Sequence, residues 1–453
     1  MKNSRILISY WQSLSSLTKK LLLFCLINTI VINFILIFIF STPIKYTVLY
    51  DIFNNFLQVK QKDDSWTPML QAIDYLKIFH QKPLYSEVFF DKNIKFQYPP
   101  TSLLFLYILK AIASQGISEV KILEVLNIFS WISVITTVFF AIKIFDETLA
   151  KSTNTNFSSS SSKADLITRY LILACLSISF YPLIKAYSLG QIQAWINCIF
   201  TVLFWCWMKD KKVISGILAG TLCLIKPQYA LIGIWGILRK QWIFMLAFIA
   251  TTLTCLLISI YLFGFTNHIN YLSVLSFISK HGEAYYHNHS VNGLLNRFFF
   301  NGEILVFQKN SFPPYNPLVY LGTTITSIAL ISLALFLPAR TKSKGSIIDF
   351  SIIALTATMA SPIAWQHHYG ILLVVYAFLL PYLLDKKILG NFKIPYLCLS
   401  YLLSSNLFYL TTQLAYAPFK LNIVQSYLLA AAFMILALLY CISIRMNKRV
   451  IED

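Results

Sequence analysis

The chain has 453 residues, of which 57% are hydrophobic and only 12% are charged. Soluble domains carry about 25% charged residues, so this composition excludes a water-soluble globular protein. On a soluble chain the net charge of +19 would suggest a nucleic-acid partner. Here the lysines and arginines flank apolar runs, as they do in the cytoplasmic loops of membrane proteins. We therefore expect contacts with membrane lipids and no nucleic acid.

The N-terminal segment, residues 1–20, is amphipathic and precedes the apolar run Leu21–Phe40. That run is long enough to cross a bilayer, and no small-residue cleavage site follows it, which favours a first span over a signal peptide. Further apolar runs predict an all-α, polytopic transmembrane helical bundle of about 12 spans over residues 21–445. A cytoplasmic tail is expected at 446–453.

Two polar stretches, at about 42–99 and about 264–316, are too long to be turns and are predicted to be outer loops. The first contains Trp66–Phe79, whose apolar residues recur at helical spacing, so we expect short amphipathic helices on the membrane surface. All seven histidines lie in these stretches or, for His367 and His368, between two spans at the same side. This one-sided set of titratable groups indicates an active site that faces the outer compartment.

The order of the spans leaves two topologies open. If Leu103–Ala113 crosses the membrane, the serine-rich linker Lys151–Lys163 lies outside. If it is a short hairpin and Val213–Leu238 folds back at Lys226–Pro227, the linker lies inside. The second topology agrees better with the positive-inside tendency around Lys209–Lys212. Both place the two polar stretches on the outer side and both termini in the cytoplasm.

The pair Asp63–Asp64, in the first polar stretch, is the leading candidate for chemistry. A carboxylate just above the bilayer can deprotonate a sugar hydroxyl as that hydroxyl attacks an activated anomeric carbon. Adjacent carboxylates can also bind a divalent metal, so metal dependence stays open. The simplest alternative is a solvated pair that caps the helix beginning near Trp66.

A lysine and a proline, Lys226–Pro227, interrupt an apolar run. A lysine at membrane depth is costly unless it is paired, and a phosphate is its natural counter-charge; the alternative is snorkelling to an interface. Tyr98 belongs to Phe96–Pro100, which is typical of an aromatic belt and a helix start. Gln191 follows Gly190, where either a plain turn or a close approach of polar backbone to a ligand is expected.

In the second polar stretch, the segment His287–Arg297 combines imidazoles, the Asn288 amide and a guanidinium. Arg297 is suited to bidentate contact with a phosphate, whereas His-x-His without a third ligand is a weak metal signal. Further on, the string Ser-Pro-Ile-Ala-Trp-Gln-His-His occupies 361–368. Its tandem histidines could donate a hydrogen bond to a phosphate or a sugar oxygen. The alternative is that they are polar residues at the membrane–water interface with no chemical role.

In this order, the strings resemble glycosyltransferase family 87, membrane enzymes of the GT-C fold that include polyprenol-phosphate-mannose-dependent α-mannosyltransferases. The matching residues are Asp64 ahead of Leu84–Tyr85, Tyr98–Pro100, Gly190–Gln191, Gly216 to Gly220 leading into Lys226–Pro227, Asn288–Ser290 with Arg297, and Ser361–Pro362 with Trp365 and His367–His368. The spacing from Asp64 to Tyr85 is longer than in the family pattern, so the choice between Asp63 and Asp64 stays open. The doubled acid and the histidine at 289 also depart from that pattern, so the identity of the substrate is not carried over from the family.

The resemblance implies a GT-C-type bundle that moves a mannose-like hexose, with inversion, from a polyprenyl-phosphate sugar donor to a hydroxyl of a lipid or glycan acceptor. An outer-loop aspartate, Asp64 or Asp63, would be the base. The residues implied to bind the donor phosphate and the substrate are Lys226, Arg297, His367, His368, Gln191, Asn288 and Tyr98. The phosphate leaves on its lipid, so no cofactor is required. The Lys-, Asn- and Ile-rich composition favours a bacterial cytoplasmic membrane, with the site facing the periplasm.

Two other functions fit part of the pattern. A transporter or flippase of lipid-linked sugars would need a polar path through the bundle and inverted repeats, and the sequence shows no such repeat. A lipid-carrier glycan ligase or polymerase would share the outer histidines and arginine but would need no single outer-loop base.

Overall fold

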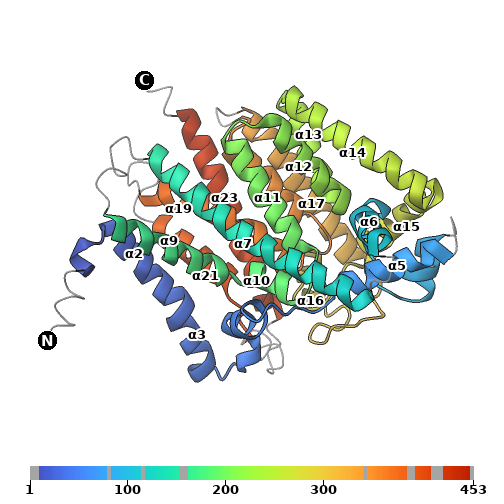
Figure 1. Cartoon of the computed structure of the whole chain (residues 1–453), viewed down its shortest axis with the longest axis horizontal. Coiled ribbons are helices and arrows are strands. Elements are labelled where there is room, and N and C mark those ends of the chain that lie inside the picture. The colour runs from blue at the N-terminus through green and yellow to red at the C-terminus, as the bar shows by residue number, and fades with distance from the viewer. Residues whose placement is uncertain are drawn as a thin grey trace.

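The computed structural model describes residues 10–78, 83–113, 118–152, 162–340, 344–384, 393–409 and 422–448. Within these ranges the chain is helical and forms no strand, which confirms the predicted all-α class. One isolated antiparallel bridge, between Asn288 and Trp365, joins two loops. The helices pack side by side in an elongated bundle (Figure 1).

Among the described residues, five helices are long and apolar enough to cross a membrane: Ser16–Ile39, Glu119–Lys151, Trp242–Phe263, Pro317–Arg340 and Asn422–Arg445. The pair α9 (Lys163–Ile178) and α10 (Tyr181–Ser188), bent by 59°, would be a sixth if the two helices form one broken span and not a re-entrant loop. The expected count of about 12 spans is not confirmed. Several apolar runs of the sequence form helices of 10–17 residues, which are too short to span a bilayer alone.

The long spans contain α2 (Ser16–Leu26), α3 (Ile32–Phe34), α7 (Glu119–Ser152), α14 (Trp242–Phe263), α17 (Pro317–Phe336) and α23 (Tyr427–Lys448). Shorter helices outside the long spans are α5 (Trp66–Ile78), α6 (Leu104–Ala113), α11 (Gln193–Met208), α12 (Lys212–Ile225), α13 (Ala230–Leu238), α15 (Phe265–His281), α16 (Val291–Phe298), α18 (Ile347–Met359), α19 (Leu372–Leu384) and α21 (Lys393–Ser405).

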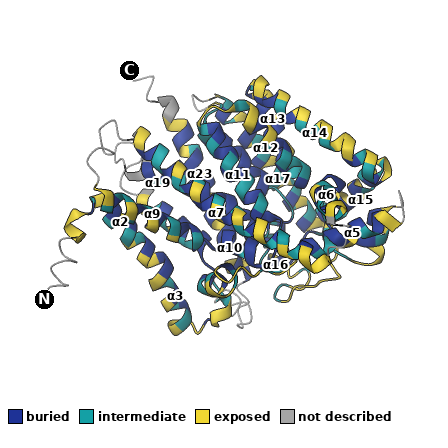
Figure 2. Ribbon diagram, viewed as in Figure 1, coloured by how far each residue is buried: buried dark blue, intermediate teal, exposed yellow. Residues whose placement is uncertain are grey.

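The short helices form the centre of the bundle, and the long ones form much of its surface. Every residue of α18 from Ile348 to Met359 is buried, whereas α14 and α3 expose apolar side chains along one face. Figure 2 shows these exposed residues along the outer helices. Apolar side chains on an outer face are expected where helices meet lipid, because lipid tails are as apolar as the side chains.

Helices α12 and α13 form a hairpin whose tip is Lys226–Pro227. A Cβ on Gly216 would lie 2.3 Å from the carbonyl oxygen of Phe244, and one on Gly220 would lie 3.1 Å from that of Phe248, so α12 runs parallel to α14 and in close contact with it. Because α13 joins the end of α12 to the start of α14, it must run back beside them. The chain therefore folds back at Lys226–Pro227, as in the second topology.

One end of the bundle, here called the basic end, collects the ends of several helices. Lys151 of α7, Asp210, Lys212 of α12 and Ser346 line one polar pocket there. Most of the serine-rich linker, residues 153–161, lies outside the described residues. Helix α7, which leads into the linker, ends at the basic end. The buried ion pair between Arg239 and Asp349, 2.6 Å from Nε to Oδ2, joins the base of the α12–α13 hairpin to α18 at the same end.

At the opposite end, here called the site end, lie the two polar stretches, the hairpin tip and the 3-10 helix Gln366–Ile371. In Figure 1, α10 and α16 lie in the lower half of the view and α5 and α15 at its right, away from the C-terminal end of α23. Of the candidate histidines, His80 falls at 79–82 and lies outside the described residues.

Candidate functional site

Asp64 is held in place by pairing between the first polar stretch and the turn before α11. The amide of Lys62 donates to the carbonyl of Ser188, and that of Asp64 donates to the carbonyl of Leu189, each at 3.0 Å. Gly190 makes this approach possible, since its φ is +66° and a Cβ there would lie 1.8 Å from the Lys62 carbonyl oxygen. The Gly-Gln string of the sequence is therefore a close backbone contact that positions Asp64.

Three residues expected from the sequence, Asp64, Gln191 and Tyr98, meet around Ser65. The Gln191 amide nitrogen donates to Oδ2 of Asp64. The Ser65 hydroxyl donates to Oε1 of Gln191 at 2.7 Å and lies 3.1 Å from the Tyr98 hydroxyl. The sequence did not reveal the role of Ser65, because a serine beside two acids is unremarkable. Its importance becomes visible only when the turn before α11, which carries Gln191, packs against it.

The Asp64 carboxylate is exposed at its edge, but protein surrounds much of it. This burial raises the pKa of Asp64 above its ordinary value, while the hydrogen bond from Gln191 and the charge of Lys62 oppose the rise. A carboxyl with a raised pKa that remains open to solvent has the properties of a general base.

Asp63 has different contacts, although it adjoins Asp64 in the sequence. Its carboxylate accepts a hydrogen bond from the Thr67 hydroxyl, and its carbonyl accepts one from the Thr67 amide at 3.0 Å. The side chain is exposed to solvent at the start of α5. The Asp63 carboxylate thus contacts the first turn of α5 through the Thr67 hydroxyl, and the two carboxylates do not share a partner.

Lys226, at the tip of the hairpin, is buried in the bundle. Its ammonium group lies 2.7 Å from Oε1 of Gln193 and 2.7 Å from Nε2 of His368. Gln193 is at the start of α11, two residues after the Gln191 that contacts Asp64. The start of α11 therefore lies between two polar groups, one around Asp64 and one around Lys226.

Four histidines, His287, His289, His367 and His368, gather at the site end. His287 Nδ1, both ring nitrogens of His289, His367 Nε2 and His368 Nδ1 have no hydrogen-bond partner among the described residues. Buried polar atoms of this kind are costly unless a ligand or water satisfies them. The group is therefore a candidate binding site for an anion or a hydroxyl-rich ligand.

The imidazoles of this group are held neutral. Burial, together with the positive charges of Lys185 and Arg297, lowers the pKa of His287 to about 3. Burial and the charge of Lys226 also lower the pKa of His368. Lys185 of α10, whose Nζ lies 3.3 Å from Oδ2 of Asp51, was missed from the sequence because nothing in the α10 segment sets it apart from a snorkelling lysine.

Asn288 fastens the second polar stretch to the Ser361–Pro362 string. Its side-chain nitrogen donates to the Pro362 carbonyl at 3.2 Å, and its side-chain oxygen accepts from the Ala364 amide at 2.9 Å. The Ser290 hydroxyl donates to the same Pro362 carbonyl at 2.7 Å. The two most specific strings of the sequence are thus brought together, and Asn288 makes contacts that position the histidines on either side of it.

Arg297 of α16 is fully buried and lies behind this segment. Its Nη1 donates to the carbonyls of Asn288, at 3.0 Å, and Tyr285, at 3.3 Å, and its Nη2 donates to the Ser426 hydroxyl at 2.7 Å. Only its Nε is without a partner among the described residues. These contacts hold the His287–Asn288 backbone against the start of α23, while the guanidinium adds positive charge to the histidine group.

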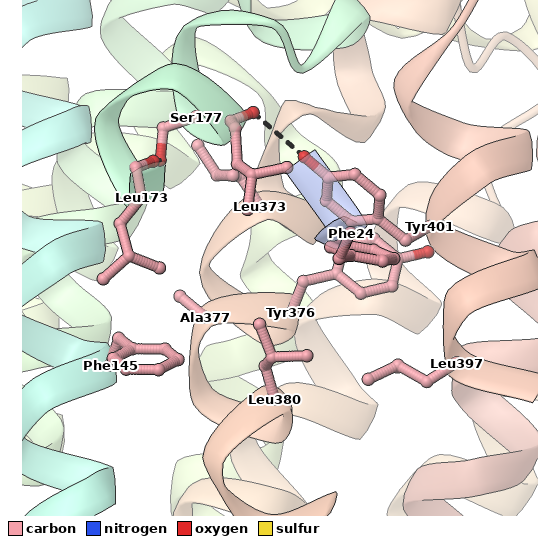
Figure 3. A pocket seen from close by; sticks show the side chains of 11 residues that line it. Phe24, Phe145, Leu173, Ser177, Leu373, Tyr376, Ala377, Leu380, Leu397 and Tyr401 are labelled. Atoms are coloured by element: carbon pink, nitrogen blue, oxygen red, sulfur yellow. Dashed lines mark hydrogen bonds between the residues drawn. The ribbon is translucent and has the colours of Figure 1, made fainter. Parts of the chain in front are cut away.

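A separate apolar pocket of about 40 Å³ lies between α2, α7, α9, α19 and α21. Figure 3 shows Phe24, Leu373, Leu380 and other apolar side chains around it, with the Tyr401 hydroxyl donating to the Leu176 carbonyl at 2.9 Å. Leu373, which lines this pocket, lies at the start of α19, and α19 follows directly on the 3-10 helix that carries His368. One wall of the pocket and the histidine group therefore belong to neighbouring segments of the sequence.

Within the described ranges, no three His, Cys, Asp or Glu side chains gather closely enough to bind a metal ion. The sequence model of glycosyltransferase family 87 matches residues 96–362, which is more than half of the chain. This match spans Tyr98, Gln191, Lys226, Asn288 and Arg297. Comparison with curated proteins and with solved structures finds no significant match.

Proposed function

The chain belongs to glycosyltransferase family 87 and is a membrane glycosyltransferase, and we propose that it transfers a hexose from a polyprenyl-phosphate donor to an acceptor hydroxyl. The proposed base is Asp64, and the proposed donor-phosphate site is the group of Lys226, His367 and His368. The observation that carries the proposal is the start of α11, where Gln191 contacts Asp64 and Gln193 contacts Lys226. A base and a cation are thereby held on either side of one helix start.

In the proposed reaction, Asp64 takes the proton of the acceptor hydroxyl as that oxygen attacks the anomeric carbon. The new carbon–oxygen bond forms as the bond from the anomeric carbon to the phosphate oxygen breaks. The bonding electrons leave with the lipid phosphate, so the configuration inverts and no covalent enzyme intermediate forms. Gln191 holds the carboxylate in place, and Tyr98 and Ser65 hold Gln191.

The leaving phosphate gains negative charge, so it needs fixed positive charge and hydrogen-bond donors. Lys226 supplies the charge. When the Lys226 ammonium donates to Nε2 of His368, the neutral imidazole carries its proton on Nδ1, which is free to donate to a phosphate oxygen. His367 Nε2 is a second unpaired ring nitrogen beside it. Arg297 and Asn288 contribute by positioning the segment that carries His287 and His289.

We place the site end outside the cytoplasm and the basic end inside, in a bacterial cytoplasmic membrane. Lys151, Lys212, Arg239 and Lys240 support this orientation, because basic residues concentrate on the cytoplasmic side of membrane proteins. The lipid tail of the donor would lie among the helices. The sugar is mannose-like in the family that the sequence resembles.

Transfer in proteoliposomes tests the proposal. Labelled polyprenyl-phosphate hexoses and a range of acceptors are supplied to the wild type, to Asp64→Asn and to the matched control Asp63→Asn. We expect Asp64→Asn to lower the transfer rate by about 10²- to 10⁴-fold, the usual contribution of a general base, and Asp63→Asn to retain most of it. Undiminished transfer in Asp64→Asn would overturn the base assignment. Movement of labelled lipid across the bilayer without any transfer would favour a flippase instead.

A further inference from the structure

Three aromatic rings lie beside the histidine group and have no part in the reaction described above. The ring centroids of Tyr285 and Phe307 lie 5.6 Å apart, those of Phe307 and Trp365 5.9 Å, and those of Tyr285 and Trp365 6.3 Å. Tyr285 and Phe307 belong to the second polar stretch and Trp365 to the distant string at 361–368, so their triangle is a product of tertiary packing. We call these three residues the aromatic platform.

The platform is accessible from solvent. Phe307 is 38% exposed, and Tyr285 and Trp365 are half-buried. Large aromatic side chains in a soluble loop normally turn inward, because each buries 150–250 Å² when it can, an amount on the order of several kcal/mol. Exposed rings that gather at a catalytic end are therefore expected to bind something.

A buried ion pair holds the platform in place. Lys95, from the first polar stretch, lies 2.7 Å from Glu283, and its ammonium group lies 4.7 Å from the centre of the Phe307 ring. Both charged side chains are largely buried. Such a desolvated cation over an aromatic ring contributes about 2 kcal/mol, enough to favour one ring position. The contact therefore helps to position the Phe307 ring of the platform.

The platform adjoins one of the two polar groups of the site, the histidine group. Tyr285 stacks on His287 at 4.8 Å, which connects it to the histidine group. On its other side, Lys309 follows Phe307 by two residues and is close enough for its charge to act on Asp64. A molecule seated on the platform would therefore adjoin the histidine group.

We propose that Tyr285, Phe307 and Trp365 form an acceptor subsite that binds a pyranose ring, so that the acceptor is a glycan. The inference rests on the proposed transferase function and adds the acceptor class, which that function left as lipid or glycan. A pyranose has one face of C–H groups, which is attracted to the negative face of an aromatic ring, and an edge of hydroxyls, which suits the unpaired His287 and His289 nitrogens. A plain lipid alcohol has no such face.

The test compares acceptors in proteoliposomes supplied with labelled polyprenyl-phosphate hexoses. The acceptors are dodecyl glycosides of the common hexoses, free disaccharides of the same sugars, and dodecanol. We expect label in the glycosides or the disaccharides, at least about tenfold above dodecanol. Preference between the first two distinguishes a glycolipid headgroup from a free glycan. Equal labelling of dodecanol would overturn the inference.

Variants at the platform make the test specific. Phe307→Ala and Trp365→Ala should raise KM for the sugar acceptor by about 5- to 10-fold and leave KM for the donor unchanged, whereas Trp365→Phe should restore binding. Phe299→Ala is the matched control, since Phe299 is also 38% exposed on the same stretch but lies outside the platform. Equal acceptor KM values for Phe307→Ala and Phe299→Ala would overturn the inference. Labelling of no acceptor by the wild type would instead overturn the transferase reaction itself.

Discussion

The ammonium group of Lys226 lies 2.7 Å from Nε2 of His368, although 142 positions separate them in the sequence. Two groups that are both basic can share this contact only if one of them is neutral. Burial lowers the pKa of both groups, and the charge of Lys226 lowers that of His368 further, so the imidazole is the neutral partner. The tautomer of His368 is thereby set by Lys226, and the Nδ1 proton is directed away from the lysine.

We therefore predict a specific defect in Lys226→Met. The substitution removes the cation proposed to meet the donor phosphate, so kcat/KM for the donor should fall by about 10²-fold, while the melting temperature changes little because Lys226 has no acidic partner among its described contacts. Lys121→Met, which removes an exposed lysine of α7, is the control. A Lys226→Met enzyme with wild-type kcat/KM would refute a phosphate-binding role.

The second prediction concerns pH. Because the pKa of Asp64 is raised, its carboxylate becomes protonated, and the rate falls, at a higher pH than for an ordinary aspartate. The hydrogen bond from Gln191 favours the ionised form. Gln191→Leu removes it, so the acidic limb of the kcat/KM profile should move to still higher pH. Measuring the profile from pH 4 to 8 checks this, with Gln58→Leu, an exposed glutamine in the same stretch, as control. If the acidic limb of Gln191→Leu stayed at the wild-type pH, Asp64 would not be the group whose protonation lowers the rate.

The third prediction concerns the contact that positions Asp64. Gly190→Ala introduces a Cβ 1.8 Å from the Lys62 carbonyl oxygen at a φ of +66°, so the backbone pairing must open. We expect a loss of more than about 2 kcal/mol in the free energy of unfolding and a loss of most activity. Gly322→Ala is the comparison, since its Cβ would meet only the flexible Leu295 side chain, at 2.7 Å. Thermal melting in detergent measures both, and equal melting temperatures would contradict the assignment.

The fourth prediction concerns the base of the hairpin. Arg239 and Asp349 are both fully buried, and Arg239 also donates to the Leu335 carbonyl at 2.8 Å. Arg239→Met leaves the aspartate charge unpaired, which should cost about 3–5 kcal/mol of unfolding free energy. The double variant Arg239→Met/Asp349→Leu should recover much of this loss, because no lone charge remains. A double variant as unstable as the single one would show that the ion pair is not the cause.

The sequence alone determined the class of this protein, because hydropathy and the placement of lysines and arginines depend only on local composition. It also made Asp64, Lys226 and His368 candidate site residues, because a charged or titratable side chain beside or inside an apolar run is conspicuous. The number of spans was not predictable in the same way. An apolar run of 14 residues and one of 22 residues differ little in composition, yet only the second forms a helix long enough to cross, as α12 and α14 illustrate.

Only the tertiary structure decided which residues meet. It separated Asp63 from Asp64, since adjacent residues can point to different partners: one to Thr67, the other to Gln191. It also brought together Tyr285, Phe307 and Trp365. Contacts between segments that are distant in sequence depend on how helices pack and loops close, which no local pattern encodes. The low charge fraction set the membrane class, and the folding back of the chain at Lys226 placed one of its few buried charges beside the histidines.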